Sequence, residues 1–239
     1  MLSLALLLAL PSISLAQPHK SYQVGAAPSW AEPLQPDLNA ATPTEQVAQG
    51  VYYLLTDYQV KVDSSERVIY RHVASKALDE RGVEKIANIE LTFDPAFESL
   101  TLHSVDVHRG WQVVPKLKTA TVRILQREKE LEALIFDGSK TASIVLDDIR
   151  IGDVVEYAYS IRGNNPVFGQ KQFGSFDLQW TVPVARIRAR LLWPNGRDIQ
   201  VRGHNNAVAP NITEGATHRD YRWDQSNQTG LRIENDAPG

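Results

Sequence analysis

The sequence has no cysteine among its 239 residues. This excludes a thiol nucleophile, and it leaves stability to the burial of apolar surface because no disulfide can form. Motifs that carry other nucleophiles, metals or nucleotides are also missing, namely G-x-S-x-G, S-x-x-K, H-E-x-x-H, the P-loop and G-x-G-x-x-G. The sequence therefore predicts a chain with no catalytic residues and no cofactor.

The chain has no strong surplus of positive charge either, since its formal net charge is -3. Binding a phosphate backbone needs a concentrated positive field, so we expect no nucleic-acid partner. No apolar run reaches the roughly 20 residues that span a bilayer. The average composition, with 43% hydrophobic and 22% charged residues, is that of a folded globular chain.

The first sixteen residues have the pattern of a secretory signal, although no basic residue precedes the apolar run. That run, Leu2 to Leu10, is followed by Pro11 and by small residues up to Ala16. We therefore expect residues 1–16 to be a signal peptide and the protein to be exported to the periplasm or cell envelope. After removal of the signal we expect no transmembrane segment.

The remainder divides by composition into an arm, a body and a short linker. Residues 17–45 are rich in proline and predict an extended arm, in which Trp30 docks on the body. Residues 46–230 form the body, and 231–239 are expected to begin a linker to a missing downstream domain. A capping box at Thr42 to Glu45 predicts a short helix that ends at Gly50.

Alternation of apolar and polar residues predicts about ten strands in the body. They lie at 53–62, 67–78, 86–93, 99–107, 121–128, 142–148, 154–162, 176–193, 198–203 and 218–224. In 99–107 the apolar positions change face midway, which indicates a bend. Turn formers such as Arg81-Gly82 and Pro194-Asn195-Gly196 separate the strands, and one or two helical turns are expected within 128–138. The prediction is all-β: an antiparallel β-sandwich or barrel.

Four carboxylates lie within ten residues, at Asp147, Asp148, Asp153 and Glu156. They could supply a catalytic acid/base pair, or they could serve a turn between two strands. Asp147 and Asp148 close one strand, and Gly152-Asp153 precede the next, in which Glu156 points away from the core. Turn chemistry explains each residue, so we favour a hairpin corner.

The six histidines show no spacing typical of metal ligands, and we expect no metal site. His103 and His108, five residues apart on a strand, are predicted to lie on opposite faces.

A turn after residue 162 is the candidate interaction loop, although its glycine and asparagines could simply provide turn geometry. The loop residues are Arg162, Asn164, Asn165 and Phe168. A second candidate surface is aromatic, with core packing as the favoured alternative. Its residues are Trp180, Trp193, Tyr221 and Trp223.

The order of segments from Val51 to Pro194 resembles the domain of unknown function 3857, which precedes transglutaminase-like domains in exported bacterial proteins. The segments that match are PSWAEP, IELTFDPAFESLTLH, the Arg109-Gly110 turn with its following strand, ILQREKELEALIFDG, LDDIRIGDVVEYAYSIRGNNPVF and QWTVPVARIRARLLWP. The resemblance implies an immunoglobulin-like or related sandwich ahead of a papain-like core with a Cys-His-Asp triad. No residue of that triad can be carried over to this sequence.

Three functions follow from these observations. The first is a non-catalytic accessory domain that packs against a downstream transglutaminase-like domain in the same polypeptide, or positions a peptide or cell-wall substrate for it. The second is a stand-alone envelope module that binds a glycan or an extended peptide. The third, a hydrolase built from scattered carboxylates, has the least support.

Overall fold

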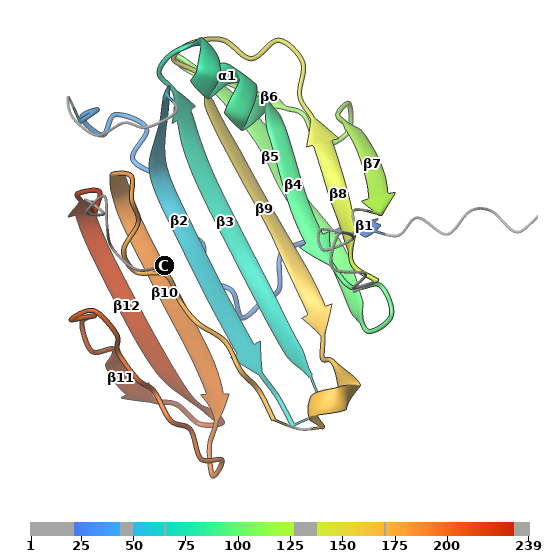
Figure 1. Ribbon diagram of the computed structural model, residues 1–239, viewed down its shortest axis with the longest axis vertical. Coiled ribbons are helices and arrows are strands. Elements are labelled where there is room, and N and C mark those ends of the chain that lie inside the picture. The colour runs from blue at the N-terminus through green and yellow to red at the C-terminus, as the bar shows by residue number, and fades with distance from the viewer. Residues whose placement is uncertain (1–21, 44–49, 65, 127–137, 170, 232–239) are drawn as a thin grey trace, which may run out of the picture.

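The structure, a computed structural model, describes residues 22–43, 50–64, 66–126, 138–169 and 171–231. Two β-sheets make up most of it (Figure 1). The large sheet has the strand order β1-β5-β9-β3-β2-β10-β12-β11, with β6 paired to β5. Its strands are β1 (Tyr22–Val24), β2 (Val51–Val62), β3 (Arg67–Ala77), β5 (Glu98–Arg109), β6 (Gln112–Pro115), β9 (Val154–Gly163), β10 (Val184–Pro194), β11 (Asn211–Glu214) and β12 (His218–Gln228).

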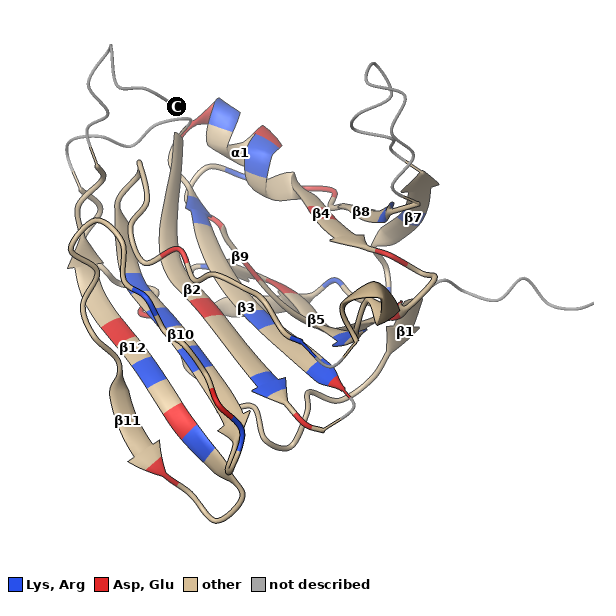
Figure 2. Ribbon diagram, turned by 60° about the horizontal axis from the view of Figure 1, so that its bottom comes forward, with Lys and Arg blue, Asp and Glu red and all other residues tan. Residues whose placement is uncertain are grey.

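A small antiparallel sheet packs over one end of the large one (Figures 1 and 2). Its strands, in the order β4-β8-β7, are β4 (Asn88–Phe93), β8 (Lys140–Val145) and β7 (Thr121–Gln126). Strict alternation in NIELTF puts Ile89, Leu91 and Phe93 on the buried side of β4. They pack against Leu100 of β5 and Val155 of β9, and each large apolar side chain buried there contributes roughly 1.5–3 kcal/mol.

We call the face of the large sheet under the small sheet the inner face. Its other end, over β2, β10 and β12, is covered by residues 171–183, which we call the strap. The strap has no regular secondary structure, and alternate residues Phe176, Leu178 and Trp180 point into a cluster that includes Trp193 and Trp223. The inner face is therefore covered by two separate elements.

The opposite, outer face is crossed by the N-terminal arm. β1 pairs in parallel with β5, after which the Trp30 carbonyl accepts a 2.9 Å hydrogen bond from Arg190 Nη1. Leu34 and Leu38 then pack on a buried cluster around Leu54 and Leu55 of β2. At Trp30 the arm thus lies against the body through its backbone carbonyl.

A helix, α1 (Glu80–Ala87), connects β3 to β4 where we predicted only a turn at Arg81-Gly82. Asp79 caps it, because Asp79 Oδ1 accepts from the Gly82 backbone N–H at 2.8 Å. Gly82 is needed for packing rather than for a turn, since a Cβ there would lie 2.0 Å from the Gly50 carbonyl oxygen. The two short helices that we predicted at 42–50 and within 128–138 fall mainly on residues outside the described part.

The predicted fold class is correct at the level of a two-layered, mostly β protein, but its details were wrong. β1 with β5, and β2 with β10, are parallel pairs, so the architecture is mixed rather than antiparallel. Parallel pairs need long connections, which here are the chain from β1 to β5 and the chain from β2 to β10. The sheets have nine and three strands, and an immunoglobulin-like arrangement is not confirmed.

Nine of the ten predicted strands overlap strands of the structure, but 198–203 has none, and 176–183 is the strap rather than the start of β10. The short strands β1 and β11 were not predicted, and β6 was expected only as the strand that follows the Arg109-Gly110 turn. The bend predicted in 99–107 is confirmed as a register shift between Leu102 and Ser104. No helix in the described ranges is long and apolar enough to cross a membrane.

Candidate binding site beside the strap

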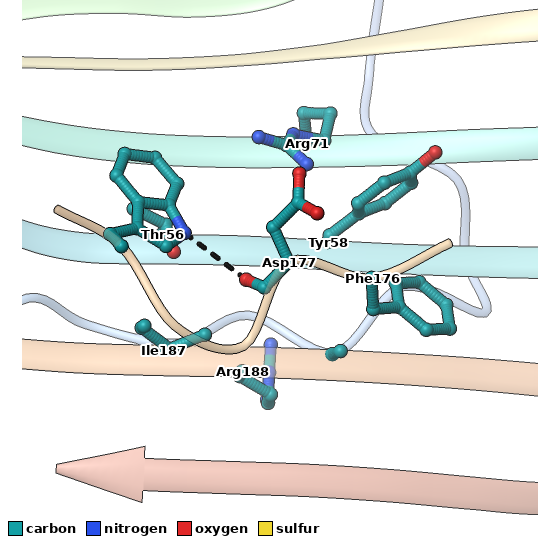
Figure 3. A pocket seen from close by; sticks show the side chains of 9 residues that line it. Thr56, Tyr58, Arg71, Phe176, Asp177, Ile187 and Arg188 are labelled. Carbon is teal, nitrogen blue, oxygen red and sulfur yellow. Dashed lines mark hydrogen bonds between the residues drawn. The ribbon is translucent and has the colours of Figure 1, made fainter. Parts of the chain in front are cut away.

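A small cavity lies between the strap and the inner face of β2, β3 and β10 (Figure 3). Its volume is about 40 Å³, little more than the space of one water molecule in the liquid. We call it the inner cavity. It is lined by Thr56, Tyr58, Arg71, Phe176, Asp177, Trp180, Ile187, Arg188 and Ala189.

Aromatic rings fix the strap over this cavity. Phe176 meets Tyr58 edge to face at 5.0 Å between ring centroids, and Trp180 meets Tyr53 in the same way at 5.1 Å. Such pairs contribute about 0.5–1.5 kcal/mol beyond the area that they bury. The Trp180 indole N–H donates to the Asp177 carbonyl at 3.1 Å, which closes the bend of the strap.

Two half-buried tyrosines of β9 lie next to the cavity, beside Arg71. Tyr159 lies opposite Arg71 in the β3–β9 register, and its ring stacks with that of Tyr157 at 6.3 Å. Burial raises the pKa of both phenols above 10.0, so they stay neutral at physiological pH. The site is therefore aromatic, with one cation that has no ion pair, Arg71, and one acid, Asp177, from opposite walls. The guanidinium of Arg188, which also lines the cavity, bonds Asp57 on the outer face.

The outer face carries a second cluster, in which Glu156 bridges two histidines. Its Oε1 accepts from His72 Nε2 at 2.7 Å and its Oε2 from His108 Nε2 at 2.6 Å. Burial opposes ionisation of Glu156, but the two hydrogen bonds prevail and its pKa lies below 4.5. Glu156 thus points away from the core, as predicted, but it is buried in a hydrogen-bonded cluster rather than placed at a turn.

His103 and His108 lie on the same face, so the prediction of opposite faces was wrong. His103 Nε2 lies 2.7 Å from Ser160 Oγ, and His108 bonds Glu156, both on the outer side of β9. The extra residue at the Leu102/Ser104 irregularity reverses the alternation between them. Even so, no three His, Cys, Asp or Glu residues in the described ranges are grouped so as to hold a metal ion.

Further along the outer face, buried ion pairs tie the arm to β2, β10 and β12, and charges of both signs band these strands in Figure 2. Arg188 binds Asp57 through two hydrogen bonds of 2.8 and 2.7 Å. Arg190 binds Asp220, and Arg222 links Asp220 to Glu32 of the arm. A hydrogen bond from Arg222 lowers the pKa of Glu32. These charges are mutually satisfied and hold the arm in place.

The acidic stretch that raised the question of catalysis is a structural corner, although not a hairpin, because β8 and β9 belong to different sheets. Asp153, 2% exposed, accepts from Arg109 at 2.7 Å, and Asp148 bonds Arg109 and Arg150. Asp147 accepts from Lys116 at 2.7 Å, and this hydrogen bond lowers its pKa. The three aspartates thus hold the chain as it passes from one sheet to the other.

The residues of the predicted interaction loop lie near one another but mostly serve local structure. Asn165 caps the 3-10 helix η3 (Pro166–Phe168) by accepting from Val167 N at 3.0 Å, and Asn164 accepts from Gln172 at 3.0 Å. Arg162 pairs with Glu66 at 2.6 Å. Phe168 is 51% exposed and touches Phe173, so an apolar surface remains at this loop.

Of the four aromatic candidates, Trp193, Tyr221 and Trp223 are buried in the core, and only Trp180 lines the inner cavity. Tyr58, Arg71 and Asp177 were missed. Arg71 lies on the inner side of β3, where the residues next to it on the same side are apolar. A charged residue at such a position is the signal that could have identified it.

Comparison with known proteins shows the family. The model of a domain of unknown function with a solved structure, DUF3857, matches residues 63–231. The chain belongs to this family. The resemblance found in the sequence is thereby confirmed, and no curated protein matches the chain.

Among solved structures, one described as a candidate protease from Parabacteroides distasonis ATCC 8503 has a similar fold, with a TM-score of 0.67 and 14% identity. The alignment covers 80% of this chain and 38% of that protein, so this chain spans well under half of its neighbour. Yeast LTA4 hydrolase in complex with bestatin aligns at a TM-score of 0.37 and 15% identity, over 81% of this chain and 30% of the hydrolase, too distant to indicate a shared fold.

Proposed function

We propose that this chain is a non-catalytic accessory domain of an exported bacterial protein with a transglutaminase-like or protease-like domain. In this role it binds a polypeptide segment, either of the neighbouring domain or of that domain's substrate. Membership of the DUF3857 family supports the proposal, as does the shared fold with part of a longer protein described as a candidate protease.

The observation that carries the binding role is the inner cavity with its aromatic and charged lining. Phe176, Trp180 and Tyr58 offer apolar contact area, and Arg71 and Asp177 offer polar contacts in a confined place. This is the usual composition of a binding site: mostly apolar, with a few polar groups. No histidine is among its lining residues, so its threonine and tyrosine hydroxyls lack a neighbouring imidazole base.

The test compares binding with turnover on the same purified protein. The protein is incubated with a mixed peptide library, and mass spectrometry follows both retention of peptides and new termini. We expect retention without cleavage, and loss of retention in Trp180→Ala under conditions where circular dichroism shows that this variant remains folded. New termini that disappear in a single Asp→Asn or Glu→Gln variant would instead establish a hydrolase.

The second candidate is a stand-alone envelope module that binds a glycan. The same aromatic lining favours it, because aromatic faces also stack on sugar rings. Calorimetric titration with oligosaccharides and peptidoglycan fragments separates the two. Heat with these sugars that is lost in Trp180→Ala, without retention of any peptide, would replace the first proposal by the second.

A further inference from the structure

Arg71 differs from most of the other arginines on the large sheet. Arg188, Arg190, Arg67 and Arg222 each pair with a carboxylate of the protein, although Arg67 Nε also lacks a hydrogen-bond partner. Arg219 has no carboxylate partner among the described residues, but it donates to the Arg197 carbonyl at 2.8 Å. Arg71 forms no ion pair with any carboxylate in the described part of the chain, and its Nε is buried without a hydrogen-bond partner. A half-buried guanidinium with a donor that has no hydrogen bond lowers the stability of the fold. We therefore expect Arg71 to bind an acceptor from another molecule.

The surroundings of Arg71 stabilise a cation but do not neutralise it. Its guanidinium carbon lies 4.3 Å from the centroid of the Tyr58 ring, in a cation–π arrangement. Tyr159 lies opposite it in the β3–β9 register, and because burial raises the pKa of Tyr159, the neighbouring phenol stays uncharged. The cation is thus held by neutral groups at the edge of a cavity.

The nearest acid of the strap shows from where a carboxylate can reach Arg71. In Figure 3 the Asp177 side chain points across the cavity toward Arg71, although the two do not come within ion-pair distance. Asp177 is exposed, so its carboxylate can turn into solvent when another acid takes the place beside Arg71. The volume of about 40 Å³ has room for a carboxylate but not for a whole residue.

We infer that Arg71 binds a carboxylate of an extended peptide, either a glutamate or aspartate side chain or a C-terminal carboxylate. The guanidinium fork suits a carboxylate through two parallel hydrogen bonds. The inference deepens the proposed function, on which it rests, by naming the chemical group that the polypeptide must carry.

A peptide fits this face better than a glycan because a polypeptide segment without sheet hydrogen bonds, the protein's own strap, already lies on it. Phe176, Leu178 and Trp180 alternate into the inner face, as the residues of a bound peptide would. The half-buried rings of Tyr157 and Tyr159, beside Arg71, offer contact area to the rest of such a peptide.

The experiment uses two short peptides, acetylated and amidated at their ends and alike except for one central glutamate or glutamine. A third peptide has the glutamine sequence with a free C-terminal carboxylate. Affinity is measured by calorimetry, and the site by the indole N–H resonance of Trp180, assigned with Trp180→Phe. The indole signals of Trp193 and Trp223, which bond Arg197 and Val208 carbonyls instead, are internal controls.

We expect the glutamate peptide to bind roughly tenfold to a hundredfold more tightly than the glutamine peptide, as a charge-assisted bidentate contact allows. Arg71→Gln should abolish that difference and Arg71→Lys should restore part of it. Asp177→Asn should tighten binding of the glutamate peptide, since it removes a competing charge. Arg186→Gln, on a partly exposed arginine paired with Asp224 on the outer face, should leave binding unchanged and serves as the matched control.

Equal binding of the glutamate, glutamine and free-carboxylate peptides would overturn the role of Arg71 while leaving the peptide-binding function in place. Absence of binding by all three would overturn both. Binding of an oligosaccharide carrying uronic acids, with no peptide bound, would show that the carboxylate comes from a sugar and would also overturn the inference. Each Arg71 variant is checked for the wild-type unfolding midpoint and for the unshifted Trp193 and Trp223 signals.

Discussion

Arg188 and Asp57 are 131 residues apart in the sequence, yet they form a buried ion pair of two hydrogen bonds on the outer face. Asp57 is 0% exposed and also accepts from Gln59 at 2.9 Å. The pair joins β2 to β10, which run parallel and are brought together only by the completed fold. It is therefore a direct measure of whether the mixed sheet forms.

Removing the acid of this pair should destabilise the protein strongly. Asp57→Ala leaves the buried Arg188 guanidinium with only the 2.6 Å hydrogen bond to the Glu32 carbonyl and a Glu32 carboxylate 4.0 Å away. Breaking a buried pair in this way typically costs about 3–5 kcal/mol in the free energy of unfolding. Urea denaturation followed by circular dichroism measures it. Asp224→Ala breaks the exposed pair with Arg186 between β10 and β12 and should cost less than about 1 kcal/mol. Equal losses in the two variants would show that the Asp57 pair is not buried in solution.

Lowering the pH should remove the contribution of Glu156 to the free energy of unfolding. Its pKa lies below the ordinary 4.5, so the unfolded chain takes up the proton first as the pH falls. The stabilisation is present above about pH 4.5 and is lost as the pH falls through the lowered pKa. The difference in unfolding free energy between wild type and Glu156→Gln should therefore shrink between about pH 7 and about pH 3. A difference that stays constant over this range would contradict the His72–Glu156–His108 cluster.

His103 should resist protonation. Burial lowers its pKa below 6.5, although the hydrogen bond to the Gly25 carbonyl acts in the other direction. In the neutral ring Nδ1 donates to Gly25, and Nε2 accepts from Ser160. The unfolded chain therefore takes up the proton first, and this part of the stability, present at neutral pH, is lost on acidification. An NMR titration of the imidazole should give a midpoint below 6.5; a midpoint above it would show that the ring is exposed or paired with an acid.

A glycine in α1 should not tolerate alanine. Within a helix, alanine is ordinarily better than glycine by up to about 1 kcal/mol. At Gly82 the sign should reverse, because the new Cβ would lie 2.0 Å from the Gly50 carbonyl oxygen, and overpacking costs about 1–3 kcal/mol. Gly174→Ala, whose Cβ would meet no atom within 4 Å, is the control and should leave the unfolding midpoint unchanged. A more stable Gly82→Ala would mean that α1 does not pack on Gly50.

Local patterns predicted most of the strands, because alternation is a property of neighbouring residues. In NIELTF and VVEYAYSIR the positions that face the core can be assigned from the sequence. The strap was misread as a strand, since Phe176, Leu178 and Trp180 alternate in the same way without sheet hydrogen bonds. The parallel pairs depend on contacts between distant segments, which no local pattern reports.

The candidate site was less accessible to sequence reasoning, for the same physical reason. Trp180 was considered as a candidate from the sequence. The other three residues, Tyr58, Arg71 and Asp177, come from β2, β3 and the strap, and only the fold brings them together. The acidic stretch was the more obvious candidate for a catalytic site because its residues are close in sequence. In the fold Glu156 is separated from the corner aspartates and bonded to two histidines of other strands. Chemistry that depends on long-range contacts has to be found in the structure.

The measurement that tests the account most directly is retention of intact peptides by the purified protein, read by mass spectrometry together with any cleavage. We expect that the wild-type protein retains peptides with a carboxylate unchanged, and that Arg71→Gln releases them while Arg186→Gln does not. Cleaved peptides, or no retention by the wild-type protein, would contradict it.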